Sequence, residues 1–127
     1  MDKTTNALNW FEIPASDINR AKKFYETIFG IQMEQMSMMG MEMAMFPGEE
    51  GNGKTSGCLC QSPFHKPSQE GSVIYLNANP DMSNVISKIE AAGGKIAMPK
   101  TAISPEIGNM AFFIDSEGNR VALHSQN

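Results

Sequence analysis

Three side chains that could transfer protons lie far apart in the 127-residue sequence: the carboxylate of Glu12, the phenol of Tyr75 and the imidazole of His124. Each lies in a segment where apolar and polar residues alternate, which is the pattern of a strand with one buried face. If these strands border one cavity, the three groups are candidates for acid–base catalysis. The same groups would also bind a ligand without turnover, and both interpretations stay open.

The alternation places further side chains on the same strand faces. Trp10 shares a face with Glu12, and Asn77 shares a face with Tyr75, because side chains two residues apart point the same way. We expect Trp10 and His124 to border the same cavity, so that a bound ligand changes the fluorescence of Trp10, the only tryptophan. The predicted ligand-binding set is Trp10, Glu12, Met41, Met43, Tyr75, Asn77 and His124.

Sulfur-containing residues gather in the first half of the chain. Seven of the eleven methionines lie in residues 33–46, and their flexible thioethers suit an adaptable pocket wall. Cys58 and Cys60 would share one strand face with Cα atoms about 6.6 Å apart, which is near the upper limit for a disulfide. We expect two buried thiols, and a soft-metal site with His124 is the alternative.

Two helices are predicted by apolar residues spaced three and four apart. The first begins after Ser16 or Asp17 and ends at Gly30, residues that suit the two caps. The second begins near Pro80 and Asp81 and reaches Ala92, before two glycines. Strands are predicted around both helices, at residues 10–14, 33–46 with a turn at 39–40, 56–61, 73–78, 95–100, 109–114 and 120–124.

The two halves of the chain have the same order of elements. Asp17 and Asp81 are 64 residues apart, and each follows a strand and precedes a helix, which indicates an internal duplication. We expect one α+β domain over residues 1–127, with a first module over 1–62, a linker over 63–71 and a second module over 72–127. His65 falls in the linker, where we expect it to be exposed and without a role.

Composition excludes several classes of protein. The formal net charge is −4 and the sequence pI is about 5.1, so a nucleic-acid binder with clustered cations is not expected. Residues 1–10 lack the apolar core of a signal peptide, and no apolar run has the length of a membrane span. We therefore expect a cytoplasmic protein that does not bind membranes.

Three segments carry a resemblance to a known family. The segment WFEIPASD at residues 10–17, with the Phe24-Tyr25 and Phe29-Gly30 pairs, resembles the opening of vicinal oxygen chelate proteins. The stretches IEAAGG at 89–94 and DSEGNR at 115–120 resemble that superfamily's second helix and closing turn. This resemblance to the glyoxalase, bleomycin-resistance and dioxygenase group implies two tandem βαβββ modules, an incomplete barrel around a cleft, and a homodimer.

The resemblance also implies where a metal would be held. In glyoxalase I and the extradiol dioxygenases, His, Glu or Gln residues on the strands bind a divalent ion inside the cleft. The matching positions here are Trp10, Val73 and Ala122, none of which can ligate a metal, and the strand at 56–61 has no His, Asp or Glu. We therefore expect neither a metal nor another cofactor.

The sequence favours a small-molecule-binding, metal-independent protein, with acid–base chemistry in its cleft as an open possibility. One alternative is a metal-dependent lyase or dioxygenase of the same superfamily. A second alternative is a drug-sequestering protein of the bleomycin-resistance kind. A third is a protein–protein module, which would expose an apolar patch instead of a cleft.

Overall fold

Both halves of the chain fold in the predicted order of one strand, one helix and three strands. The computed structural model describes residues 1–49, 51 and 53–127. The first half contains β1 (Trp10–Pro14), α1 (Ile18–Phe29), β2 (Glu34–Met38), β3 (Met41–Met45) and β4 (Ser56–Gln61). The second half contains β5 (Tyr75–Asn77), α2 (Ser83–Ile89), β6 (Lys95–Ser104), β7 (Gly108–Ile114) and β8 (Arg120–Ser125).

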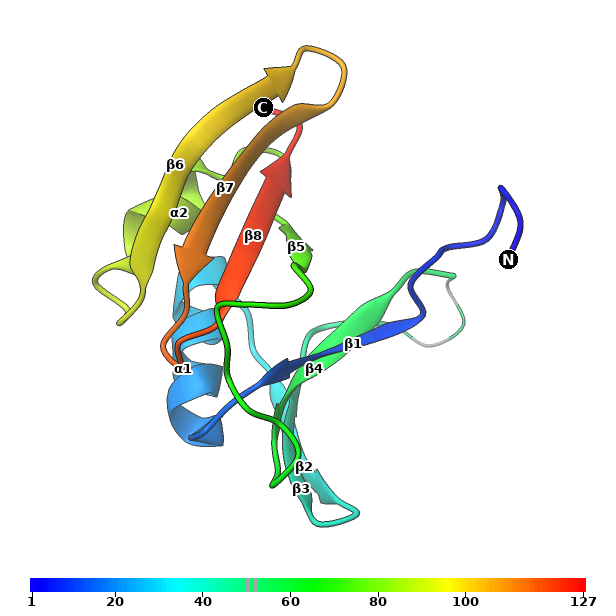
Figure 1. The fold of residues 1–127 in the computed structure, drawn as a ribbon, viewed down its shortest axis with the longest axis vertical. Helices are drawn as coiled ribbons and strands as arrows, with labels where there is room; N and C mark the ends of the chain where they lie inside the picture. Colours follow the sequence, from blue (N-terminus) through cyan, green and yellow to red (C-terminus); the bar gives the residue numbers. More distant parts are fainter. Residues whose placement is uncertain (50, 52) are drawn as a thin grey trace.

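Each half forms its own four-stranded sheet (Figure 1). The strand order is β1-β4-β3-β2 in the first sheet and β5-β8-β7-β6 in the second. In both sheets the first and last strands of the half pair in parallel, and the other pairs are antiparallel. The repeated order agrees with the predicted duplication, and the α+β class is confirmed. The two sheets do not close into a barrel.

Local chemistry explains the boundaries of α1. The Asp17 carboxylate accepts hydrogen bonds from the Asn19 and Arg20 N–H groups, which satisfies donors that a helix start leaves free. Gly30 adopts the left-handed conformation, with φ of 63°, and its N–H donates to the Glu26 carbonyl. Glycine carries no Cβ penalty there, so the helix ends where the sequence predicted.

Three elements, α2, β5 and β6, differ clearly in length from the sequence prediction. Strand β5 covers only Tyr75–Asn77 of the expected residues 73–78. The helix α2 ends at Ile89 instead of reaching Ala92, because residues 90–94 form turns in which the Gly94 N–H donates to the Ile89 carbonyl. Strand β6 continues to Ser104 instead of ending at Lys100. Its pairing with β7 persists past three register irregularities, which a period-two pattern does not predict.

The two halves are joined through their helices and a common core. The helices α1 and α2 contact each other and lie side by side behind the strands in Figure 1. The ring of Phe24 on α1 lies 6.0 Å from that of Phe113 on β7, and both residues are fully buried. One apolar cluster therefore spans both halves, whereas the opposite faces of the two sheets stay open.

The predicted side-chain alternation is confirmed on the strands that matter most. Ile13, Leu76, Val121 and Leu123 are buried on the helix side. Trp10 is 45 % exposed and Tyr75 is 51 % exposed on the opposite faces. Among the described residues, no helix is long and apolar enough to cross a membrane.

Candidate functional site

The predicted ligand-binding residues fall into two groups, one on each sheet. Trp10 and Glu12 lie on β1, and Met41 and Met43 lie on β3 of the first sheet. The other three residues, Tyr75, Asn77 and His124, lie on the paired strands β5 and β8 of the second sheet. Neither of two well-defined cavities among the described residues is lined by Trp10 or His124, so a cavity shared by these two stays a prediction.

The side chains of the group on the second sheet contact their own surroundings. Asn77 is paired in register with His124, whose Nε2 lies 2.7 Å from the Ile107 carbonyl oxygen. The Asn77 carboxamide oxygen accepts from the Asn79 N–H at 2.9 Å. The Tyr75 ring packs against Phe112, with ring centroids 6.0 Å apart. These contacts fix the side chains but do not bring Tyr75 or His124 to Glu12.

The partner of Glu12 is His65, which corrects the expectation that His65 is exposed and has no role. His65 Nε2 lies 2.8 Å from Glu12 Oε1, and only 17 % of the His65 side chain is exposed. The linker therefore folds back and brings His65 against Glu12 on β1. A carboxylate and an imidazole in hydrogen-bond contact can exchange a proton, and in this structure His65, not His124, makes that contact with Glu12.

A tight turn places His65 opposite Glu12. The His65 N–H donates to the Ser62 carbonyl, which closes a turn just after β4. The Ser62 hydroxyl lies 2.6 Å from His65 Nδ1 and accepts from the Phe64 N–H. Because Ser62 contacts Nδ1, the other ring nitrogen is directed at the carboxylate. With Glu12 ionised, Nε2 carries the proton in this contact.

A sulfur cluster lies beside this pair. Cys58 and Cys60 are free and buried, as predicted, and the two pack with Met43, Met41 and Met45. Cys60 Sγ lies 3.7 Å from Met41 Sδ. Burial, and next the charge of Glu12, raise the pKa of the Cys60 thiol and raise that of Cys58 to about 12. These thiols are therefore protonated near neutral pH.

The alternative of a soft-metal site with His124 is wrong in its histidine. His124 lies on the second sheet, whereas the histidine that lies near Cys60 is His65. Glu12, Cys60 and His65 each offer a ligand atom, and these three atoms lie within 4.8 Å of one another. Met43 belongs to the buried cluster, with 4 % exposed, so it does not form an open pocket wall.

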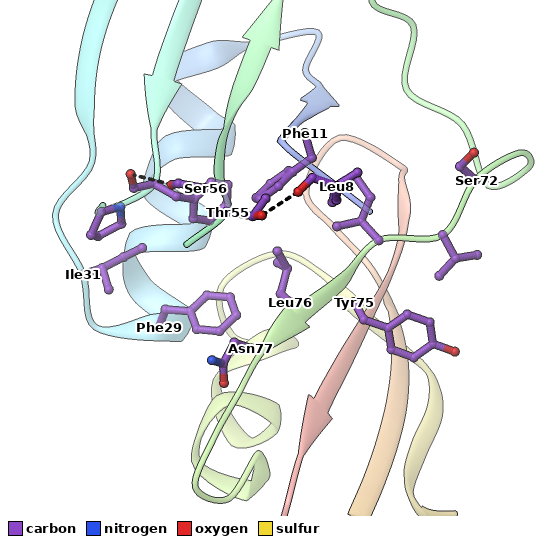
Figure 2. A pocket seen from close by; sticks show the side chains of 14 residues that line it. Leu8, Phe11, Phe29, Ile31, Thr55, Ser56, Ser72, Tyr75, Leu76 and Asn77 are labelled. Atoms are coloured by element: carbon purple, nitrogen blue, oxygen red, sulfur yellow. Dashed lines mark hydrogen bonds between the residues drawn. The ribbon is translucent and has the colours of Figure 1, made fainter. Parts of the chain in front are cut away.

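The larger of the two cavities lies between the halves and on the side of the sheets that faces the helices. Its volume is about 650 Å³. Phe11, Phe29 and Leu76 surround its centre, and the Tyr75 ring points away from it (Figure 2). The remaining lining is mostly apolar and comes from Leu8, Ile31, Phe46, Pro47, Thr55, Ser56, Ser72, Val73, Ile74 and Asn77.

Few polar groups face this larger cavity. The Thr55 hydroxyl donates to the Leu8 carbonyl at 2.7 Å, and the Ser56 hydroxyl donates to the Phe46 carbonyl at 3.4 Å (Figure 2). A smaller cavity of about 240 Å³ shares Ser72 and Ile74 with it and includes Glu12 in its lining. The two cavities thus lie next to each other at the junction of the modules.

Sequence reasoning missed most of the larger cavity. Phe11 was assigned to the helix-side core, but it is only half-buried, and its ring is tilted by 47° against that of Phe46, with centroids 5.5 Å apart. The available signal was a pair of apolar residues, Phe29 and Ile31, on either side of the Gly30 cap of α1. A helix end that continues apolar past its glycine must cover something outside its own sheet.

The superfamily's metal does not fit the residues at its usual positions. Trp10 is an exposed indole, Ala122 is a buried methyl side chain, and Val73 is aliphatic. None of the three provides an oxygen, nitrogen or sulfur lone pair suitable for a metal. The inherited ligand arrangement is therefore absent from this chain.

Comparison with known proteins finds relatives of the glyoxalase and bleomycin-resistance kind. Residues 8–48 match a family model described as bleomycin resistance protein-like N-terminal. A glyoxylase-like domain-containing protein of Didymella fabae is 27 % identical over 119 residues, which cover 91 % of each chain. A Mycobacterium tuberculosis protein that carries the name glyoxylase is 30 % identical over 94 % of this chain, but the chain spans only 45 % of it.

Solved structures share the fold. A variant of glyoxalase I from Zea mays matches with a TM-score of 0.72 and 19 % identity, over 94 % of this chain and 46 % of that one. An antibiotic-binding protein from Streptomyces matches with a TM-score of 0.67 and 22 % identity, over 99 % of this chain and 100 % of that one. The repeated βαβββ modules and these relatives support the resemblance of the chain to the vicinal oxygen chelate superfamily, whose fold it shares.

Proposed function

We propose that this chain binds a small, mainly apolar molecule in the larger cavity between its modules. The observation that carries the proposal is the 650 Å³ volume lined by Phe11, Phe29 and Leu76. Ligand pockets have volumes of roughly 300–1,000 Å³ and are lined mostly by apolar side chains with a few polar groups. Thr55, Ser56 and Asn77 supply such polar groups at the rim.

We further propose that binding proceeds without turnover and without a metal. The cavity lining contains no carboxylate, imidazole or thiol among the described residues. The Thr55 and Ser56 hydroxyls donate to backbone carbonyls, and the Tyr75 ring points away from the cavity (Figure 2). The Streptomyces neighbour of similar length is named an antibiotic-binding protein, which supports the sequestering alternative. The metal-dependent lyase or dioxygenase is disfavoured by Trp10, Val73 and Ala122.

A ligand screen tests this proposal. Planar and polycyclic apolar molecules are added to the protein, bound molecules are recovered by equilibrium dialysis, and each is analysed by mass spectrometry. Recovery of an unchanged ligand supports binding without turnover, whereas a converted product contradicts it. If no molecule that fits the cavity binds, the proposed function fails.

Two matched variants locate the binding site. Leu8→Lys puts a charge on a cavity-lining side chain that is 50 % exposed, and should weaken binding at least about tenfold because a cation loses hydration in an apolar site. Ile107→Lys makes the same change at a side chain that is 53 % exposed and outside both cavities. It should leave binding unchanged, and equal effects would place the ligand elsewhere.

Two further proposals concern the oligomeric state and the location of the protein. We propose a homodimer, because the resemblance implies one and the open sheet faces expose Trp10 and Tyr75. Light scattering at several concentrations tests it, and a monomer throughout would reject it.

We propose a cytoplasmic location because both cysteines are free thiols.

A further inference from the structure

A second candidate site lies on the open face of the first sheet, away from the lining of the larger cavity. We infer that Glu12, Cys60 and His65 bind one thiophilic divalent metal ion, of the kind that Zn²⁺ represents. Glu12 and His65 are not at Trp10, Val73 or Ala122, the positions to which the resemblance assigns ligands, whereas Cys60 lies on the strand where it assigns a further one. The inference does not depend on the proposed ligand cavity, and either can fail alone.

The strand register brings the first two ligands together. In the parallel pair of β1 and β4, Glu12 lies opposite Cys58, and Pro14 lies opposite Cys60. Glu12 and Cys60 are therefore diagonal neighbours on one sheet face, within reach of long side chains. His65 arrives from the turn after β4 and closes the triangle, with its Nε2 2.8 Å from Glu12 Oε1.

The separations are close to those of a real site. Zinc bond lengths of about 2.0–2.3 Å and tetrahedral angles put two ligand atoms about 3.4–3.6 Å apart. The three candidate atoms lie within 4.8 Å of one another. An ion would have to open the Glu12–His65 contact slightly and draw the Cys60 sulfur in by about 1 Å, which side-chain rotations provide.

The donor set selects the class of metal. A thiolate, an imidazole and a carboxylate are the three kinds of ligand that zinc uses in proteins, and three protein ligands leave a fourth position for water. Hard ions such as Mg²⁺ prefer oxygen-only sites, so the Cys60 sulfur disfavours them. The Met41 thioether, 3.7 Å from Cys60 Sγ, adds a soft atom on the same side.

Ser62 orients the His65 ring in the way that neighbouring residues orient histidine ligands in known metal sites. Ligating imidazoles usually donate their other N–H to a fixed acceptor. The Ser62 hydroxyl lies 2.6 Å from His65 Nδ1 and is held by the Phe64 N–H. When Nε2 binds the ion, the single imidazole proton moves from Nε2 to Nδ1, which then donates to the Ser62 hydroxyl oxygen, and the proton of the Cys60 thiol leaves to solvent.

The site is reachable from solvent on one side only. The Glu12 side chain is 35 % exposed and that of His65 is 17 % exposed, while Cys60 is fully buried. An ion therefore enters past the carboxylate and meets the sulfur last. The cluster therefore differs from a simple surface ion pair, because a buried thiol lies beneath the carboxylate and the imidazole.

Cobalt titration tests the inference on the full chain. The protein is stripped with a chelator, kept reduced by a thiol-free reductant and titrated with Co²⁺, whose bond to a thiolate gives charge-transfer absorption in the near ultraviolet. We expect this band to saturate at one Co²⁺ per chain and to be displaced by Zn²⁺. Absence of the band, or saturation only with large excess, would overturn the inference.

Variants assign the ligands. Cys60→Ser and His65→Gln should weaken Co²⁺ binding more than about 100-fold, and Ser62→Ala about tenfold, as expected for ligands and for a supporting residue. Cys58→Ser, the buried thiol on the same face, and His124→Gln, the only other histidine, should keep the band. Loss of the band in either control, with retention in Cys60→Ser or His65→Gln, overturns the assignment. His65→Gln changes a partly exposed turn residue, and circular dichroism of this variant verifies that the fold is kept.

Discussion

The phenol of Tyr25 donates a hydrogen bond of 2.8 Å to Asp115 Oδ2 in the core between the two modules. Tyr25 lies on α1, whereas Asp115 begins the turn between β7 and β8. Burial, and next the Asp115 charge, raise the pKa of the Tyr25 phenol well above its ordinary value, so the phenol stays a donor. The contact ties one module's helix to the other module's closing turn.

Tyr25→Phe should therefore destabilise the fold without changing its packing. Asp115 keeps its bonds from the N–H groups of Glu117 and Asn119 and from the Asn119 carboxamide, so one charged hydrogen bond is lost. We expect the free energy of unfolding to fall by about 1.5–3 kcal/mol. Urea denaturation measures it, and a shift below about 0.5 kcal/mol, the size of a neutral surface change, would contradict the assignment.

The pKa of Glu117 predicts how the stability of the fold depends on pH. Burial opposes its ionisation, but hydrogen bonds from the Arg20 guanidinium and the Asp17 N–H outweigh burial, so the pKa of Glu117 lies below its ordinary 4.5. A lowered folded-state pKa stabilises the fold above pH 4.5, and this contribution is lost as pH falls through the folded value.

Asp115 acts in the opposite direction. Burial raises its pKa above 3.8, so protonation below the raised value favours the folded state. Glu117→Gln should remove only the contribution of the Glu117 carboxylate, which is the one lost in acid. The free energy of unfolding of the variant should therefore fall less than that of the wild type between about pH 7 and about pH 3. The exposed Glu90→Gln serves as control, and parallel pH curves for wild type and Glu117→Gln would refute the idea.

Gly57 allows the two strands β1 and β4 to approach each other. A Cβ at this position would collide with the carbonyl oxygen and ring of Phe11. Gly57→Ala should lower the free energy of unfolding by about 1–3 kcal/mol, the usual cost of overpacking. It should also weaken the binding of ligands in the larger cavity, because Phe11 lines that cavity. At Gly48 the nearest atoms belong to the Ser56 side chain at 3.1 Å, so Gly48→Ala is the milder comparison.

The elements that sequence predicted best are those fixed by local chemistry. Asp17 and Gly30 bound α1 because a carboxylate and a left-handed residue satisfy the helix ends. Met39 and Gly40 have φ of 54° and 77°, and they form the predicted hairpin turn between β2 and β3. No such cap ends α2 at Ile89, so the apolar pattern overestimated its length.

The site was harder to predict because it depends on the placement of segments that alternation does not define. Alternation separated Glu12 from Ile13 correctly, but it could not show that a turn at Ser62 returns His65 to Glu12. It also assumed that the two open faces meet. Since the modules join through α1 and α2 instead, the larger cavity formed on the helix side, around Phe11 and Leu76.

Trp10 can distinguish the two candidate sites in one experiment. Its side chain shares the open face with Glu12, two residues away, and does not line the larger cavity. Because Trp10 is 45 % exposed, its emission should be partly red-shifted and accessible to acrylamide. Trp10→Ala should cost less than about 1.5 kcal/mol, the lower end for full burial of a large apolar side chain.

Two titrations then report on different faces. Co²⁺ bound by Glu12, Cys60 and His65 should quench Trp10 emission, because the ion would lie beside β1 on the same side as the indole. An apolar ligand in the larger cavity should leave that emission nearly unchanged, even where dialysis shows binding. Chelation should reverse the cobalt effect without releasing the apolar ligand. Quenching by the apolar ligand alone would place it on the open face with Trp10, and the cavity around Phe11 and Leu76 would no longer be its site.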